Sequence, residues 1–168
     1  PIDMDIEDIL KNSNNVVAET VFKLAGGKFV NNTGALVNSQ KMLDAYFAKL
    51  NLNPEDIKVV DGSGVSKNNI MTSDFMASFL ANEKVQELLN GKLATAGEGT
   101  LTNRMLYFKD NLYAKTGTLS DVSAIAGYIT SRNGKKYAFD IMINDPKTKS
   151  SDKKLLEEYI LRDIYANY

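Results

Sequence analysis

The chain has 168 residues, 43% of them hydrophobic, which is enough for one domain that buries roughly 70% of its unfolded surface. Twenty Lys and Arg balance 21 Asp and Glu without long runs of one sign, which excludes a nucleic-acid-binding protein. His and Cys are absent, which excludes Ser-His-Asp and Cys-His catalysis and the usual zinc sites, so no metal or cofactor is expected.

Two amphipathic helices are predicted in the first fifty residues. Val17, Val21 and Leu24 recur at helical spacing, which predicts a helix over 14–25 that begins at or just after Ser13 and ends at Gly26-Gly27. The second helix is marked by the apolar residues Met42, Leu43, Tyr46, Phe47 and Leu50. A turn follows it, in which Asn53 and Pro54 resemble a cap and first helical position.

The middle of the chain combines a short extended segment, a loop and two more helices. Residues 57–60 are predicted to be extended and lead into Asp61-Gly62-Ser63-Gly64, a tight loop. Thr72 or Ser73 is predicted to cap the next helix, with apolar residues from Phe75 to Leu80. Val85, Leu88 and Leu89 indicate another short helix before Gly91.

From about residue 111 the pattern changes to that of strands, at 111–116, 121–131 and 136–144. Asn133-Gly134 predicts a type I′ hairpin turn between the last two. A C-terminal helix follows, with Leu155, Leu156, Tyr159, Ile160 and Ile164 on one face. Helices, then antiparallel strands, then a helix indicate an α+β fold.

The predicted strand 136–144 is apolar on both faces, which is typical of a central strand. Its only partner close in sequence is the preceding strand, so its other edge is expected to be free. A free apolar edge favours pairing with a second copy, and a homodimer through 136–144 is therefore a possible assembly. The alternative is that the C-terminal helix covers this edge.

Lys115-Thr116-Gly117, followed by Thr118, lies at the end of a predicted strand. Its structural interpretation is a strand that ends in a turn. Its functional interpretation is a strand edge that offers a cation, hydroxyls and backbone N–H groups to a carboxylate and a developing oxyanion. In a chain without His, a Lys with a lowered pKa is the available base.

A Ser-x-Asn spacing occurs three times, and spacing alone does not choose among the matches. Helix capping, local backbone hydrogen bonding and hairpin-turn chemistry each give one match a structural explanation. The matches are, in that order, Ser13/Asn15, Ser66/Asn68 and Ser131/Asn133.

Five ordered segments together are similar to one family. They are KNSNNVVAETVFKLAG, VVDGSGVSKNN, AGEGTLTNR, AKTGTLSDVSAIAGYI and LRDIYANY. The chain resembles the D-alanyl-D-alanine carboxypeptidases of peptidase family S13, the low-molecular-mass class C penicillin-binding proteins. The resemblance implies the C-terminal part of the penicillin-binding protein and serine β-lactamase fold. Residues 1–105 would be its mainly helical part with Ser-x-Asn, and 106–168 its antiparallel strands and last helix.

The resemblance also implies a function. These enzymes remove the terminal D-Ala from peptidoglycan stem peptides, and often cleave D-alanyl cross-bridges, through an acyl-enzyme that β-lactams trap. They act outside the cytoplasm, in the periplasm or at the outer face of the membrane.

Site residues follow from the resemblance as well. Ser13 would relay a proton to the leaving amine and Asn15 would bind a substrate amide carbonyl. Lys115 would set the positive potential and contact Ser13, so the two residues are expected to lie close together. The terminal carboxylate and the substrate side chain would contact residues at or next to the motifs: Thr116, Gly117, Thr118, Lys67 and Leu119.

The family's nucleophile, the serine of a Ser-x-x-Lys motif, is expected upstream of the other motifs. Here that spacing occurs only after Lys-Thr-Gly, at Ser150/Lys153 and Ser151/Lys154, where either serine is better interpreted as a helix cap. The chain is therefore expected to contain no nucleophile, to be inactive alone, and to be an excised piece whose partner is the N-terminal half of the same domain.

Two alternatives remain open. A class A β-lactamase orders its motifs in the same way but needs a deacylating Glu between them, and the nearest approach, the segment 87–90, is one residue too short. A peptidoglycan-binding or structural fragment without turnover is the other.

Overall fold

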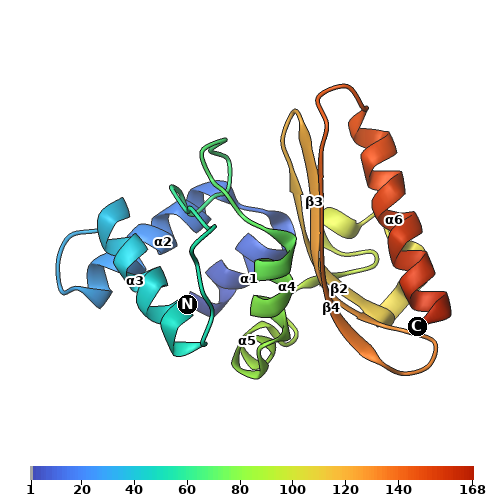
Figure 1. Cartoon of the computed structure of the whole chain (residues 1–168), viewed down its shortest axis with the longest axis horizontal. Coiled ribbons are helices and arrows are strands. Elements are labelled where there is room, and N and C mark those ends of the chain that lie inside the picture. The colour runs from blue at the N-terminus through green and yellow to red at the C-terminus, as the bar shows by residue number, and fades with distance from the viewer. Residues whose placement is uncertain (1) are drawn as a thin grey trace.

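The computed structural model describes residues 2–168, in which a helical half precedes a four-stranded sheet and a last helix (Figure 1). The helices are α1 Ile2–Asn12, α2 Asn15–Phe29, α3 Leu36–Lys49, α4 Ser73–Ala81, α5 Glu83–Leu89 and α6 Ser150–Asn167. The strands are β1 Ala94–Thr95, β2 Leu112–Thr118, β3 Val122–Thr130 and β4 Lys136–Asn144, with 3-10 turns at Gly99–Leu101 and Leu106–Asn111.

The sheet is antiparallel throughout, in the order β1-β2-β3-β4. Its register places Lys115 of β2 opposite Ala126 of β3, which in turn lies opposite Asp140 of β4. Figure 1 shows α4 against one face of the sheet and α6 against the other. The predicted α+β class is confirmed, and the strand bounds differ from the predicted ones by only a few residues.

The main core lies between the sheet and α6. Strand alternation sends one set of side chains of β2 and β3 toward α6, where they are sealed from solvent. Burying each large apolar side chain is worth about 1.5–3 kcal/mol, so this layer accounts for much of the folding free energy. Its fully buried large members are Leu101, Met105, Phe108, Leu112, Ile125, Ile129 and Leu161.

A smaller core on the opposite face joins the sheet to α1 and α4. Leu80, Leu93 and Tyr128 are buried there, and Leu10 of α1 packs against them. The Tyr128 hydroxyl donates to the Leu80 carbonyl at 2.9 Å. Burial raises the pKa of Tyr128 to about 12, because the phenolate would lose its hydration.

The pair Gly26-Gly27 does not end its helix, contrary to the sequence prediction, and α2 continues to Phe29. The reason is the close approach of α3. A Cβ on Gly26 would lie 2.4 Å from the backbone of Ser39, whose hydroxyl donates to the Phe22 carbonyl at 2.8 Å. Glycine at this position therefore allows two helices to touch.

The β3–β4 connection is not the predicted type I′ turn, which needs positive φ at both central residues. Here Gly134 has φ 78°, whereas Asn133 is not left-handed. The Gly134 amide donates to the Ser131 carbonyl and the Ser131 amide donates to the Lys135 carbonyl, both at 2.9 Å. A turn that begins at Ser131 and ends in one left-handed glycine closes the longer hairpin.

The turn predicted at Asn53-Pro54 is present, and no helix starts there. The Asn53 side chain accepts from the Glu55 amide at 3.2 Å, and the Ile57 amide donates to the Pro54 carbonyl at 2.9 Å. These bonds close an isolated turn, and the chain then extends to the single bridge between Lys58 and Ile70.

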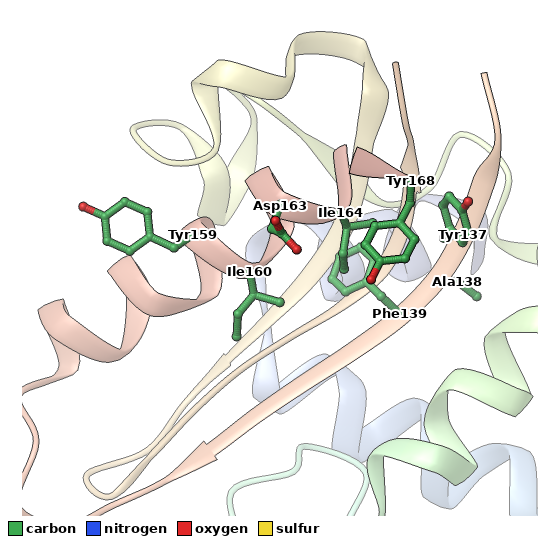
Figure 2. A pocket seen from close by; sticks show the side chains of 8 residues that line it. All are labelled: Tyr137, Ala138, Phe139, Tyr159, Ile160, Asp163, Ile164 and Tyr168. Carbon is green, nitrogen blue, oxygen red and sulfur yellow. The ribbon is translucent and has the colours of Figure 1, made fainter. Parts of the chain in front are cut away.

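The outer edge of β4 has no strand partner within residues 2–168, as the sequence predicted. The helix α6 packs mainly on β3 and leaves this edge open. Between β4 and α6 lies an open apolar groove of about 600 Å³, in which Phe139, Ile164 and Tyr168 lie close together (Figure 2).

No helix in the described part of the chain is long and apolar enough to cross a membrane.

Candidate active site

Ser13 lies in the tight turn between α1 and α2. Its φ of 62° is left-handed, and its amide donates to the Ile9 carbonyl at 3.1 Å. Asp8 holds the turn by accepting from the side-chain amides of Asn12 at 2.8 Å and Asn14 at 2.7 Å. These two hydrogen bonds lower the pKa of Asp8.

Asn14, not Ser13, caps α2, because its side chain accepts from the Val17 amide at 3.2 Å. The Ser13 hydroxyl is therefore free of the capping role. Asn15 is the first residue of α2, and its side chain is exposed.

Lys115 joins the strand to this turn. Its ammonium donates to the Ser13 hydroxyl and to the Thr116 carbonyl, both at 2.7 Å. Burial lowers the pKa of Lys115, because the charged form loses hydration. The predicted proximity of Ser13 and Lys115 is confirmed, and it distinguishes Ser13 from the other two Ser-x-Asn serines.

The remaining motif residues become exposed toward the end of β2. Thr116 points into the protein and is only 8% exposed, whereas Gly117 and Thr118 are exposed. The Thr116 hydroxyl donates to the hydroxyl of Thr100 at 2.8 Å. A Cβ on Gly117 would meet nothing closer than Ala124, at 3.8 Å, so the space over the strand is open there.

Lys67 and Leu119 line one cavity of about 490 Å³ beyond the end of β2, together with Met142 and Asn144 of β4. Lys67 is 70% exposed, and its ammonium lies 2.8 Å from the Asp121 carboxylate. This hydrogen bond lowers the pKa of Asp121. It also links the loop after Gly64 to the turn after the Lys-Thr-Gly strand.

The two Ser-x-x-Lys spacings of the chain lie in the first turns of α6. Lys153 is buried in α6 and donates to the Asp121 carbonyl at 2.7 Å, and the Ser151 hydroxyl bonds to its neighbour Asp152. Neither Ser150 nor Ser151 caps α6, contrary to the sequence prediction, since the cap position is Lys149 and no side chain bonds the first turn. The polar groups of α6 instead hold the turn between β2 and β3.

Sequence reasoning missed Thr100 and a buried ion pair behind it. The Arg104 guanidinium lies 2.6 Å from the carboxylate of Glu157, which is 0% exposed and also accepts from the Ser123 hydroxyl at 2.6 Å. Thr100 and Arg104 belong to the segment AGEGTLTNR, one of the five on which the resemblance rests. No local pattern in that segment indicates which distant residues its side chains contact.

Comparison with known proteins agrees with the resemblance. Residues 1–161 match the D-Ala-D-Ala carboxypeptidase 3 (S13) family. The D-alanyl-D-alanine carboxypeptidase DacB of Haemophilus influenzae is 24% identical over 175 aligned residues, which cover 95% of this chain and 36% of that protein. A D-alanyl-D-alanine carboxypeptidase of Actinomadura sp. is 32% identical over 149 residues, covering 80% of this chain and 27% of the relative.

Solved structures show the same fold. A crystal structure of penicillin-binding protein 4 from Haemophilus influenzae, complexed with a β-lactam, superimposes with a TM-score of 0.86 at 22% identity, over 99% of this chain and 42% of that one. An extended-spectrum β-lactamase does so with a TM-score of 0.69 at 18% identity, over 98% of this chain and 63% of that one. The chain thus spans about a third of the length of the curated relatives it matches.

Proposed function

Since the chain belongs to the D-Ala-D-Ala carboxypeptidase 3 (S13) family, we propose that it is part of a serine hydrolase that removes D-Ala from peptidoglycan stem peptides. The same chemistry would cleave D-alanyl cross-bridges. The observation that carries the proposal is the 2.7 Å hydrogen bond between Lys115 and Ser13, which joins two motifs of the family. Because peptidoglycan lies outside the cytoplasm, the protein would act there.

Ser13 would transfer the proton. Its oxygen accepts a hydrogen bond from the Lys115 ammonium, so its own hydrogen is free to be donated. When the acyl-enzyme forms, a serine oxygen bonds to the substrate carbonyl carbon and the bond to the leaving amine breaks. Ser13 would give its proton to that amine and regain one from the hydroxyl of the attacking serine, so that one proton passes from the nucleophile to the leaving amine. The ammonium of Lys115 would stabilise the negative charge that develops on the Ser13 oxygen during this relay.

The exposed end of β2 would bind the substrate. The positive charge of Lys115 and the hydroxyls of Thr116 and Thr118 suit the terminal carboxylate, and the Thr118 N–H would contribute to the oxyanion hole. Asn15, exposed at the start of α2, would bind an amide carbonyl of the peptide.

The cavity beyond the strand would take the substrate side chain. It is lined by Lys67 and Leu119, which offer a cation and an apolar surface. The Lys67–Asp121 ion pair at its mouth is exposed and therefore weak, so a ligand with charged groups can replace it at little cost.

The nucleophile would come from outside these 168 residues, and the chain alone would be inactive. The edge of β4 and the groove beside α6 are where we place the polypeptide that completes the domain (Figure 2). The support is that the longer relatives contain more than twice the matched length, while no strand among residues 2–168 pairs with the outer edge of β4 beside the apolar groove. A second copy at the same edge is the competing occupant.

A fluorescent penicillin tests the proposal. We expect covalent labelling of the full-length gene product on a serine outside this chain, and none of the isolated chain. Slow turnover of the penicillin by the full-length protein, rather than a persistent adduct, would favour the β-lactamase alternative. Labelling of the isolated chain, or no labelling of the full-length protein, would refute the proposed site.

A further inference from the structure

The segment from Ala96 to Arg104, here the 96–104 loop, contacts three separate parts of the candidate site. It lies between the end of α1, which leads to Ser13, the Lys-Thr-Gly strand β2 and the inner face of α6. The role inferred for this loop is in substrate binding, so the inference rests on the function proposed above.

The loop places one hydroxyl against the motif. The Thr116 hydroxyl donates to the Thr100 hydroxyl at 2.8 Å. Thr116 is 8% exposed, whereas Thr100 is partly exposed. Each threonine hydroxyl has a single hydrogen, so one hydrogen is used between the two oxygens and the other stays free for a ligand.

One side of the loop is anchored in the core. Leu101, next to Thr100, is fully buried between β2 and α6. Arg104 forms the 2.6 Å ion pair with the buried carboxylate of Glu157, which also holds Ser123 of β3. A buried carboxylate with two short partners is held in one position, because loss of Arg104 would leave its charge uncompensated and loss of Ser123 would remove a buried hydrogen bond.

The other side is anchored on α1. Gly99 has φ 46°, and a Cβ on it would lie 2.1 Å from the Lys11 carbonyl, so the loop backbone touches α1 directly. The Lys11 ammonium also lies 3.6 Å from the Glu98 carboxylate. Lys11 precedes Ser13 by two residues, so Thr100 has a defined position relative to both Ser13 and β2.

We propose that Thr100 is a positioning residue for carboxylate binding and that Thr100 and Thr116 act as one hydroxyl pair. In a chain of two hydroxyls, each bond polarises the next, so the terminal hydrogen becomes a better donor to an anion. When a carboxylate binds, both hydroxyls rotate, so that Thr100 donates to Thr116 and Thr116 donates to the carboxylate. Thr100 thus orients the chain, and neither hydroxyl is useful without the other. The pair recognises the terminal carboxylate of the substrate or of a β-lactam.

The test compares two probes on the full-length gene product: a fluorescent penicillin with a free carboxylate and its methyl ester. Thr100→Val keeps the shape of the side chain and removes the hydroxyl. We expect it to lower the rate constant for labelling by the free acid about tenfold, the value of one hydrogen bond to a charged group. Labelling by the ester should stay unchanged, and Thr100→Ser, which keeps the hydroxyl, should label at the wild-type rate.

The double variant decides whether the pair acts as a unit. Thr116→Val and the double variant Thr100→Val/Thr116→Val should each show the same tenfold loss as Thr100→Val alone. Thr130→Val, which removes a hydroxyl from β3 away from the loop, is the matched control and should label normally. Additive losses of about a hundredfold, an equal loss with the ester, or no loss in Thr100→Val would each overturn the inference.

If the wild-type protein is not labelled at all, the proposed function is refuted. The interaction between the Thr100 and Thr116 hydroxyls can then still be measured through its effect on stability. The same four proteins (wild type, both single variants and the double) are then compared by urea unfolding. A coupling of a few-fold in the unfolding constant supports the hydroxyl pair, and a coupling of zero overturns it.

Discussion

The ammonium of Lys115 donates to the hydroxyl of Ser13 at 2.7 Å across 102 positions of the chain. One residue belongs to a strand and the other to a turn between two helices. The bond depends on the charged form of the lysine, whose pKa burial lowers from 10.5.

We therefore predict an alkaline limit to penicillin labelling of the full-length protein. The Lys115 ammonium donates below its folded pKa and is lost above it, so the rate should fall at a midpoint below pH 10.5. Lys115→Arg keeps the charge and should move this limb to higher pH, even if the overall rate is lower. Ser13→Ala should lower the rate at every pH. An alkaline limb that does not move in Lys115→Arg would show that another group titrates.

The buried pair between Arg104 and Glu157 should contribute strongly to stability. Arg104→Leu leaves the Glu157 carboxylate buried with only Ser123 as partner, and we expect a loss of about 3 kcal/mol in the free energy of unfolding, measured with urea. The control is Arg162→Leu, because its pair with Glu158 has the same 2.6 Å distance but is more exposed, at 46% for Arg162 and 23% for Glu158 against 20% for Arg104 and 0% for Glu157.

That control should cost less than about 1 kcal/mol. The double variant Arg104→Leu/Glu157→Leu should recover most of the loss, because no unpaired charge remains. Equal effects of Arg104→Leu and Arg162→Leu would mean that burial of the first pair is energetically unimportant.

Asp140 on β4 should destabilise the protein at neutral pH. One of its carboxylate oxygens is buried without a hydrogen-bond partner, and burial raises its pKa from 3.8. Because the pKa of Asp140 is raised in the folded state, the contribution of this carboxyl group to stability is most favourable below pH 3.8. That contribution is lost as the pH rises through the pKa of the folded state.

Asp140→Asn removes the charge and should raise the unfolding free energy at pH 7 by about 1 kcal/mol. The advantage should vanish in urea unfolding at low pH, where the wild-type carboxyl is protonated too. The exposed Asp110→Asn should change stability by less than about 0.5 kcal/mol. An Asp140→Asn variant with the same gain at all pH values would indicate repacking rather than titration.

The isolated chain should associate through the open edge of β4. A charge on an edge strand opposes pairing between chains, so Ile143→Lys should reduce the mass measured by light scattering at micromolar concentration. Val37→Lys places the same charge on the exposed face of α3 and should leave association unchanged. Monomeric wild-type chain would contradict the prediction. Association that both variants reduce equally would point to a surface other than β4.

Much of the fold follows from local patterns. The periodicity of Val17, Val21 and Leu24 predicted α2, and alternation predicted β2, β3 and β4 to within a few residues. These patterns succeed because periodic apolar residues report which face of an element is buried. The element α1 was not predicted, although Ile2, Ile6, Ile9 and Leu10 recur at helical spacing, so the local signal was present and was missed.

Only the tertiary structure decided which residues meet. The sequence contains three Ser-x-Asn spacings, and it is the packing of α1 against the sheet that brings Ser13 to Lys115. Gly26 continues its helix because α3 lies against it, and Thr100 reaches Thr116 because Arg104 and Gly99 hold its loop on both sides. These contacts join residues that are 13 to 102 positions apart. Local propensity reports the conformation and burial of a segment, whereas the partner of a side chain depends on how whole elements pack.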